Sequence, residues 1–134
     1  MDNELSTIKN ILNESKVLAV VGLSPKENRA SHGVSKYLQS QGYKIIPVYP
    51  REEEILGEKV YRSLSDIDKE VDTVVIFRDP KYVVPIVEEA AKINAKTVWM
   101  QEGVINQQAY NIAKEKGMNV IMDRCMLKEH KKHM

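Results

Sequence analysis

The residues best suited to do chemistry lie in a loop from Gly22 to Gly33, between a buried apolar run and a helical pattern. The loop carries Lys26, Arg29 and Ser31, and a loop in this place offers free backbone amides at the positive end of a helix. Together these groups predict a phosphate-binding site. The spacing does not fit GxGxxG, because Gly22 and Gly33 are the loop's only glycines. A plain strand-to-helix turn with Ser31 as N-cap therefore stays open as the alternative.

A second candidate follows the next apolar run, where the sequence reads VYPRE. A site for NAD normally carries an acidic residue about 20 positions after the glycines, where it holds the ribose hydroxyls. Here Tyr49 stands at the expected strand end and Arg51 follows two residues later. A guanidinium favours a ribose that bears a phosphate, as in NADP or coenzyme A. The alternative for Arg51 is an exposed surface charge beside Glu52 and Glu53.

Two further loops are placed to complete such a site. Phe77 and Arg78 begin the segment FRDP, where the ring is suited either to stack on an adenine or to pack in the core. Gln101 and Glu102 belong to the segment WMQEG, which is expected to leave the sheet at the same edge. We expect both loops to line a ligand groove.

Other chemistry has little support in the sequence. Cys125 is the only cysteine; a mixed disulfide with a ligand thiol is conceivable, but no base that would activate the thiol is visible nearby. His32, His130 and His133 lack the spacing of metal ligands, so no metal site is predicted. No Ser-His-Asp pattern, nucleophile elbow or Walker loop is present, so we predict no catalysis by the chain itself.

The elements that must position these loops follow from the hydrophobic pattern. Five short, nearly continuous apolar runs begin at Val17, Lys44, Asp72, Lys96 and Asn119, as is typical of parallel strands covered on both faces. Helical patterns separate most of them, at 31–41, after Asp79-Pro80 as N-cap and first residue, and after Asn106 as N-cap. We therefore predict an α/β, Rossmann-like, doubly wound fold with a five-stranded parallel sheet in the order 3-2-1-4-5, whose ligand site lies at the carboxyl ends of the strands.

Three segments depart from this regular alternation. The crossover between the second and third strands is too short for a full helix, and only a short one near 65–68 is expected. Residues 1–15 place Leu5, Ile8 and Leu12 on one helical face, which predicts an extra N-terminal helix. Residues 127–134 form a basic tail without an apolar stripe.

Length, composition and charge limit the number of domains, the classes of partner and the location that can be expected. The chain has 134 residues, 43% of them hydrophobic, and a net charge of +1, which predicts one compact domain over 1–134 and excludes a global field for nucleic acid or an anionic membrane. The beginning MDNELSTIKN lacks the regions of a signal peptide, and no apolar run approaches the roughly 18–20 residues that cross a bilayer. A cytoplasmic location is expected.

Several blocks in one order resemble a known family, the small stand-alone CoA-binding-domain proteins of bacteria and archaea. The blocks are VVGLSPKENRASHGVSKYLQSQGYKIIPVYP, EILGEKVYRSLSDI, VDTVVIFRDP, VWMQEGV and VIMDRC. The family is similar to the CoA-binding N-terminal domain of the succinyl-CoA synthetase alpha subunit. The resemblance implies a Rossmann-type fold with coenzyme A lying across the strand ends.

The resemblance also implies roles for individual residues. Gly22, Ser24, Arg29, Ser31 and Gly33 match the turn over the phosphates. Arg51 stands where the synthetase domain has a basic residue, and segments lining the adenine and pantetheine are matched by Phe77, Arg78, Gln101 and Glu102. The sequence departs from the family in its longer, glycine-poor first loop and in Met126, where proline is common. A second domain bearing a phosphorylated histidine is absent from the chain, so a complete ligase is not expected.

The sequence thus predicts a protein that binds coenzyme A or a short acyl-CoA without transforming it. An NADP-dependent oxidoreductase is the enzyme alternative, supported by the fold and by Arg51. A regulatory subunit that senses CoA or another adenine nucleotide, and signals through a protein partner or as a homodimer, is the other.

Overall fold

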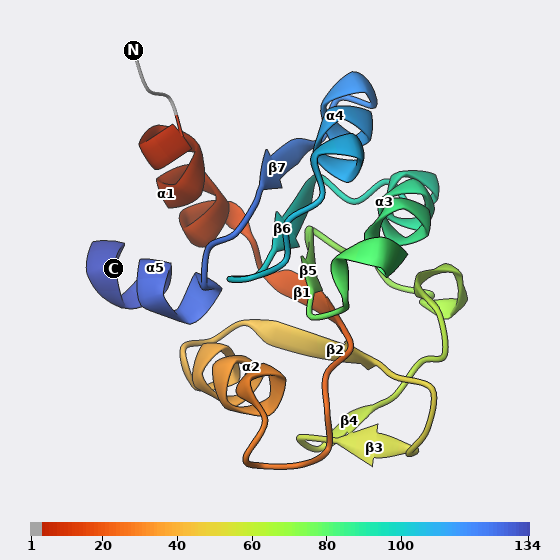
Figure 1. Cartoon of the computed structure of the whole chain (residues 1–134). Helices are drawn as coiled ribbons and strands as arrows, with labels where there is room; N and C mark the ends of the chain where they lie inside the picture. The colour runs from red at the N-terminus through yellow and green to blue at the C-terminus, as the bar shows by residue number, and fades with distance from the viewer. Residues whose placement is uncertain (1–3) are drawn as a thin grey trace.

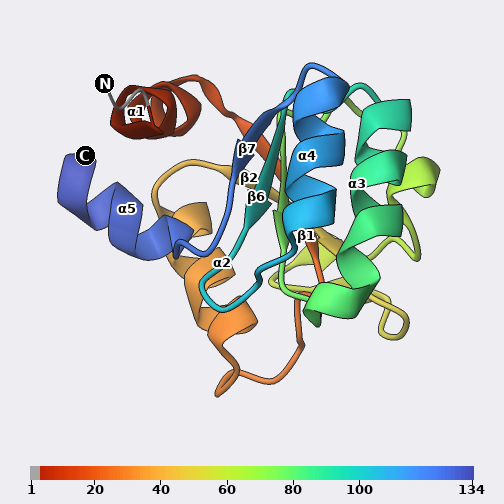
Figure 2. The same ribbon diagram turned by 45° about the horizontal axis from the view of Figure 1, so that its top comes forward.

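The structure is a computed structural model that describes residues 4–134. A parallel five-stranded sheet lies between two layers of helices (Figures 1 and 2), which confirms the predicted α/β, Rossmann-like fold. The sheet strands are β1 (Val17–Val21), β2 (Lys44–Val48), β5 (Thr73–Ile76), β6 (Thr97–Met100) and β7 (Asn119–Ile121). One face is covered by α1 (Glu4–Glu14), α2 (Ala30–Ser40) and α5 (Met126–His133), and the other by α3 (Val83–Lys92), α4 (Gln107–Glu115) and the 3-10 turn η1 (Leu64–Asp66).

The strand order differs from the predicted one. The sheet runs β2-β1-β5-β6-β7, so the five strands follow the order 2-1-3-4-5 and not 3-2-1-4-5. The third strand, β5, pairs with β1 from Leu18↔Thr73 to Val21↔Ile76, which leaves β2 at the edge. The point where the strand order reverses is consequently between β1 and β5.

Pro47 explains why β2 lies at the edge of the sheet. Lys44 N–H donates to the Lys16 carbonyl, and the Val48 carbonyl accepts from Gly22 N–H, so these residues form their hydrogen bonds on the β1 side. Because successive residues of a strand alternate, the nitrogen of Pro47 faces the other side. Proline has no N–H to donate to a neighbour and is confined to edges of sheets. A central second strand would lose a ladder bond at Pro47, whereas an edge strand loses none.

The outer edge of β2 is instead closed by a short detour of the chain. Tyr49 N–H donates to the Tyr61 carbonyl at 3.0 Å, and Tyr61 N–H donates to the Pro47 carbonyl at 2.9 Å. Between these residues the chain forms a hairpin of β3 (Glu54–Ile55) and β4 (Glu58–Lys59). Beyond them lies η1, the short helix expected in this thin crossover.

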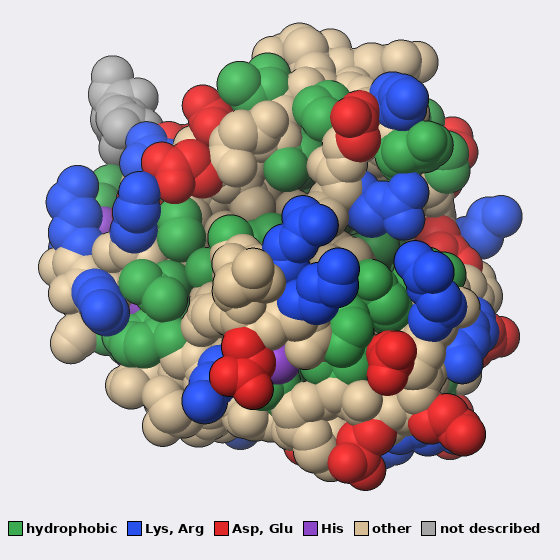
Figure 3. All heavy atoms as spheres, turned by 60° about the horizontal axis from the view of Figure 1, so that its bottom comes forward, with side chains coloured by type: hydrophobic (Ala, Val, Ile, Leu, Met, Phe, Trp, Pro, Cys, Tyr) green, Lys and Arg blue, Asp and Glu red, His purple; other side chains and the backbone are tan. Residues whose placement is uncertain are grey.

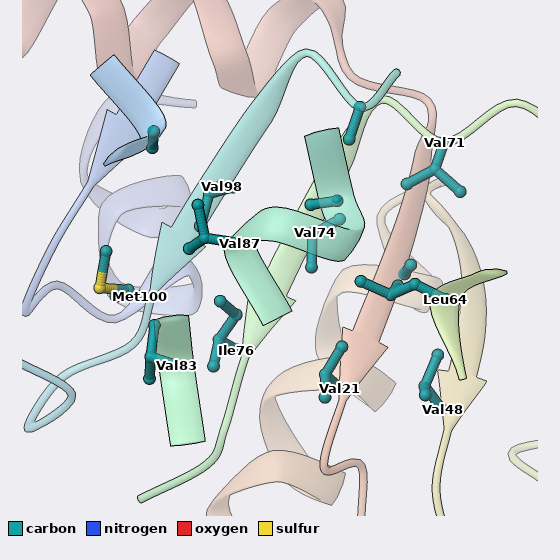
Figure 4. Close-up of a cluster of buried hydrophobic side chains, with 14 of the residues drawn as sticks. Val21, Val48, Leu64, Val71, Val74, Ile76, Val83, Val87, Val98 and Met100 are labelled. Atoms are coloured by element: carbon teal, nitrogen blue, oxygen red, sulfur yellow. The ribbon is translucent and has the colours of Figure 1, made fainter. Parts of the chain in front are cut away.

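The two faces of the sheet bury separate apolar clusters because side chains alternate along each strand. On the side of α3 and η1, Val21, Val74 and Ile76 pack against Leu64 and Val83 (Figure 4). On the other side, Leu18, Val20 and Trp99 are among the residues packed under α1, α2 and α5. The sheet is thereby held rigid from both faces, with its strand ends free to carry the loops.

Helix ends follow the sequence closely, with one addition. Asp79 accepts a hydrogen bond from Lys81 N–H at the start of η2 (Pro80–Tyr82), and Asn106 accepts one from Ala109 N–H at the start of α4, as predicted. The segment expected to be a basic tail forms α5, which buries Met126, Glu129 and His130. The extra N-terminal helix is present as α1, and residues 1–3 of its predicted range lie outside the described residues. None of the helices described is long and apolar enough to cross a membrane.

Candidate ligand pocket at the strand ends

A pocket of about 760 Å³ opens at the carboxyl ends of β1, β2 and β5. It lies beside the reversal in strand order, where sheets of this type bind their ligands, and its volume is within the range of small-molecule sites. Its walls come from the three loops that follow these strands. The residues that line it are Gly22, Ser24, Pro25, Lys26, Arg29, Ala30, Ser31, Tyr49, Pro50, Arg51, Glu52, Phe77 and Arg78.

Gly22 lets the first of these loops leave the sheet. Its φ is +89°, and a Cβ placed there would lie 2.4 Å from the Phe77 carbonyl oxygen. Its N–H donates to the Val48 carbonyl at 2.9 Å, so the end of β1 is fixed between the ends of β2 and β5. A residue with a side chain fits neither the backbone conformation nor the space.

The loop from Gly22 to α2 is held by its own polar groups. Ser31 Oγ accepts a hydrogen bond from Ser24 N–H at 3.0 Å, and His32 Nδ1 donates to the Ser24 carbonyl at 2.9 Å. Ser24 Oγ accepts from Lys26 N–H at 3.1 Å. Ser31 therefore braces the loop from inside the first turn of α2. It is not the N-cap, because that position belongs to Arg29, whose side chain makes no capping hydrogen bond.

Positive charge is concentrated in the pocket, although the chain as a whole is nearly neutral. Lys26, Arg29, Arg51 and Arg78 line it together with one carboxylate, Glu52. None of these four cations forms an ion pair with another residue in 4–134. On this side of the molecule, Lys and Arg side chains gather among hydrophobic ones (Figure 3). Such a surface is suited to an anion that also has an apolar part.

The apolar part of the lining comes from Phe77 and Tyr49. Both side chains are half-buried and pack against the cluster on the α2 side of the sheet. Nearby, the Arg78 guanidinium lies 4.6 Å from the centre of the Tyr82 ring, a distance at which a cation is attracted to the face of an aromatic ring. A flat aromatic group of a ligand would find ring faces and cations within the same pocket.

Three of the residues predicted for the site lie outside the lining. Gly33 is exposed in α2. Gln101 is buried, and its Oε1 accepts a hydrogen bond from Met126 N–H at 3.0 Å, which fixes the start of α5. Glu102 is exposed and binds Lys128 Nζ at 3.0 Å, an interaction that raises the pKa of the lysine. Their contact with a ligand remains a prediction.

Other residues of the lining were not singled out from the sequence. Pro25, Ala30, Pro50 and Glu52 contribute to the walls, and their nearness in sequence to Ser24, Ser31 and Arg51 was the available signal. Cys125 precedes α5 as its N-cap and is half-buried outside this lining. Among residues 4–134, no group of three or more His, Cys, Asp or Glu side chains is arranged to hold a metal ion.

Comparison with known proteins places this pocket in a family context. A family model described as a CoA binding domain matches residues 16–131. YneT of Bacillus subtilis (strain 168) is 46% identical over 123 residues, which are 92% of this chain and 91% of YneT. The alpha subunit of acetate–CoA ligase (ADP-forming) II from Pyrococcus furiosus is 32% identical over 120 residues; the match covers 81% of this chain but 26% of that subunit.

Solved structures share the fold over nearly the whole chain. A hypothetical protein from Pyrococcus horikoshii OT3 has a TM-score of 0.92 at 41% identity, covering 96% of this chain and 90% of its own. The cell-free protein ID.343 from Thermus thermophilus has a TM-score of 0.93 at 32% identity, and both chains are covered completely.

Proposed function

The chain belongs to the CoA binding domain family, and from this premise we propose that it binds coenzyme A, or a short acyl-CoA, in the pocket at the ends of β1, β2 and β5. The proposal includes binding without chemical transformation, because the residues that line the pocket include no histidine or cysteine and a single carboxylate, Glu52, which gives little support for nucleophilic or acid–base catalysis. Relatives such as the P. furiosus ligase subunit are much longer than the matched region, so their ligase activity is not carried over.

One observation carries the proposal: four cations without ion-pair partners in the described chain line a single pocket with aromatic side chains. Coenzyme A has a diphosphate, a ribose phosphate and an adenine, so it offers both kinds of complementary group. Charge-assisted hydrogen bonds from arginine to phosphate are the strongest that such a site can form. The net charge of +1 makes these local contacts the main source of affinity.

Each part of the ligand then has proposed partners. The diphosphate binds at the start of α2, near Ser24, Arg29 and Ser31, where backbone amides and the helix dipole favour an anion. Arg51, on the loop after β2, binds the ribose phosphate. The adenine lies near Phe77, and the pantetheine leaves along the loop that contains Gln101 and Glu102.

Isothermal titration calorimetry with CoA, dephospho-CoA, NADP and ATP tests the proposal. We expect CoA to bind with micromolar or tighter affinity and the others more weakly. Arg29→Ala weakens binding of CoA and dephospho-CoA alike, by about 10- to 100-fold if a charged hydrogen bond is lost. Arg51→Ala weakens the binding of CoA but leaves the affinity for dephospho-CoA unchanged. Lys9→Ala, which removes an exposed cation from α1, is the charge-matched control.

The outcomes separate the alternatives. If CoA gives no heat while NADP binds, an NADP-dependent oxidoreductase becomes the better interpretation. If CoA binds with equal affinity to the wild type and to both arginine variants, the ligand lies elsewhere on the protein. Gel filtration with and without CoA would reveal a change in assembly expected of a sensing subunit.

A further inference from the structure

Arg62 does not line the pocket, yet it contacts the loop that brings four lining residues there, Tyr49, Pro50, Arg51 and Glu52. Its Nη1 donates to the carbonyl oxygens of Tyr49 at 3.1 Å, Arg51 at 3.0 Å and Glu52 at 2.8 Å. Three carbonyl groups from four consecutive residues thus converge on one guanidinium nitrogen. The loop after β2 wraps around Arg62, and because Arg62 and residues 50–52 are exposed, the guanidinium takes the place of water at these acceptors.

This loop needs an external support. Pro50 has no N–H to contribute to a turn, and Glu52 has a φ of 67°, a left-handed conformation that residues other than glycine adopt at a cost in free energy. Backbone of this kind persists where the surrounding structure holds it. Nη1 carries two N–H groups, which the three carbonyl oxygens share, and these hydrogen bonds are of the charge-assisted kind, stronger than those between neutral groups.

Arg62 is itself tied to the sheet. The preceding residue, Tyr61, is buried and forms a parallel bridge with Val48, the last residue of β2. The guanidinium therefore starts from backbone fixed to the same strand whose loop it holds. The backbone from which this side chain extends is thereby held by the sheet at the edge of the pocket.

We propose that Arg62 is a positioning residue for ligand binding, which holds the loop after β2 so that Arg51 reaches the ribose phosphate. The inference rests on the proposed function. The guanidinium of Arg62 also offsets the partial negative charge of these carbonyl oxygens, which would otherwise repel a nearby phosphate. Without Arg62 the loop populates other conformations, and the apparent Kd for CoA rises in inverse proportion to the fraction that remains competent to bind.

Titration calorimetry of four proteins tests this role: the wild type, Arg62→Ala, Arg51→Ala and the double variant. Arg62→Ala is expected to raise the Kd for CoA about tenfold, equivalent to about 1.4 kcal/mol, and to change that for dephospho-CoA by less than about twofold. Because Arg62 acts through Arg51, the double variant binds CoA no more weakly than Arg51→Ala does. Independent contributions would instead add in free energy.

Three further variants separate positioning from charge and from folding. Arg62→Lys keeps a cation with several donors, so it retains more CoA affinity than Arg62→Met, which keeps length without donors. Lys59→Ala removes a nearby exposed cation whose Nζ lies 5.0 Å from the centre of the Tyr61 ring, and it leaves CoA affinity unchanged. Thermal unfolding of each variant shows that the domain is folded at the temperature of the titration.

Three results would each overturn the role of Arg62 while CoA binding itself stands. The first is that Arg62→Ala binds CoA with wild-type affinity although Arg51→Ala binds it more weakly. The second is full additivity of the two substitutions, and the third is an equal loss of CoA affinity in Lys59→Ala. Absence of CoA binding to the wild type would overturn the proposed function, and this inference with it.

Discussion

At the scale of single residues, two glycines predicted for the same phosphate loop have different environments. A side chain at Gly22 would meet the Phe77 carbonyl oxygen, whereas a Cβ at Gly33 has no atom within 4 Å and lies in the first turns of α2. Gly22 therefore serves the junction of three strand ends. Gly33 is an ordinary helix position with an intrinsic cost, because glycine loses more conformational freedom than alanine on folding.

Replacing each glycine by alanine tests this difference. Gly22→Ala is expected to lower the free energy of unfolding by about 2–4 kcal/mol, from left-handed strain and overpacking together, and to weaken CoA binding. Gly33→Ala is expected to raise the free energy of unfolding by about 0.5–1 kcal/mol. Urea unfolding of both variants measures these changes. A loss of CoA affinity in a stable Gly33→Ala protein would show that Gly33 does contact the ligand.

At the scale of elements, α5 is attached through a histidine buried between two tyrosines. His130 Nδ1 shares a hydrogen bond of 2.8 Å with the Tyr37 hydroxyl, and its ring stands edge-on to Tyr37 and Tyr43. Burial lowers the pKa of His130 from its ordinary value of 6.5. Lys131, whose Nζ lies 5.3 Å from the centre of the Tyr37 ring, adds positive charge on the same side. The docked helix thus favours a neutral imidazole.

This predicts a pH dependence for the stability of the protein. The folded state binds the His130 proton less readily than the unfolded state, so stability is constant with respect to this group above about pH 6.5 and declines as the pH falls below it. We expect the Tm to fall between pH 7.5 and 5.5 by a few degrees more in the wild type than in His130→Gln. Lys132→Gln, which removes an exposed charge from the same helix, is the control and should keep the wild-type slope. Equal slopes in all three proteins would contradict this account of α5.

At the scale of the whole molecule, charge is nearly balanced overall but unbalanced locally. The net charge is +1, while four cations and one carboxylate line the pocket. A polyanion that needs a broad basic surface is therefore not expected to bind, since its affinity depends on many phosphate contacts. A small ligand with several phosphates needs only the pocket.

A thermal shift assay distinguishes these two kinds of anion. CoA at about 100 times its Kd stabilises the folded state by about 2.7 kcal/mol, which for a domain of this size raises the Tm by about 10 °C. Duplex DNA at physiological salt leaves the Tm unchanged. Arg29→Ala at the same CoA concentration shows a much smaller shift. A comparable shift with DNA would mean that the basic surface extends well beyond the pocket.

Much of this architecture was determined by local sequence. The apolar runs predict the five strands, Asp79 and Asn106 cap the helices that follow them, and the blocks around Gly22, Arg51 and Phe77 indicate the family and most of the pocket lining. These features depend on neighbours along the chain and on side-chain period, so they can be read without knowing the fold. Even the edge position of β2 had a local signal in Pro47.

Only the tertiary structure decided how distant segments meet. The strand order depends on which edge of β1 receives β5, and the burial of α5 depends on Tyr37 and Tyr43, far away in the chain. Gln101 proved to hold the start of α5, and Arg62 proved to hold the loop of Arg51. Such contacts join groups separated by loops, and the hydrophobic pattern of either segment is the same whichever partner it meets. Packing of the complete chain selects the partner.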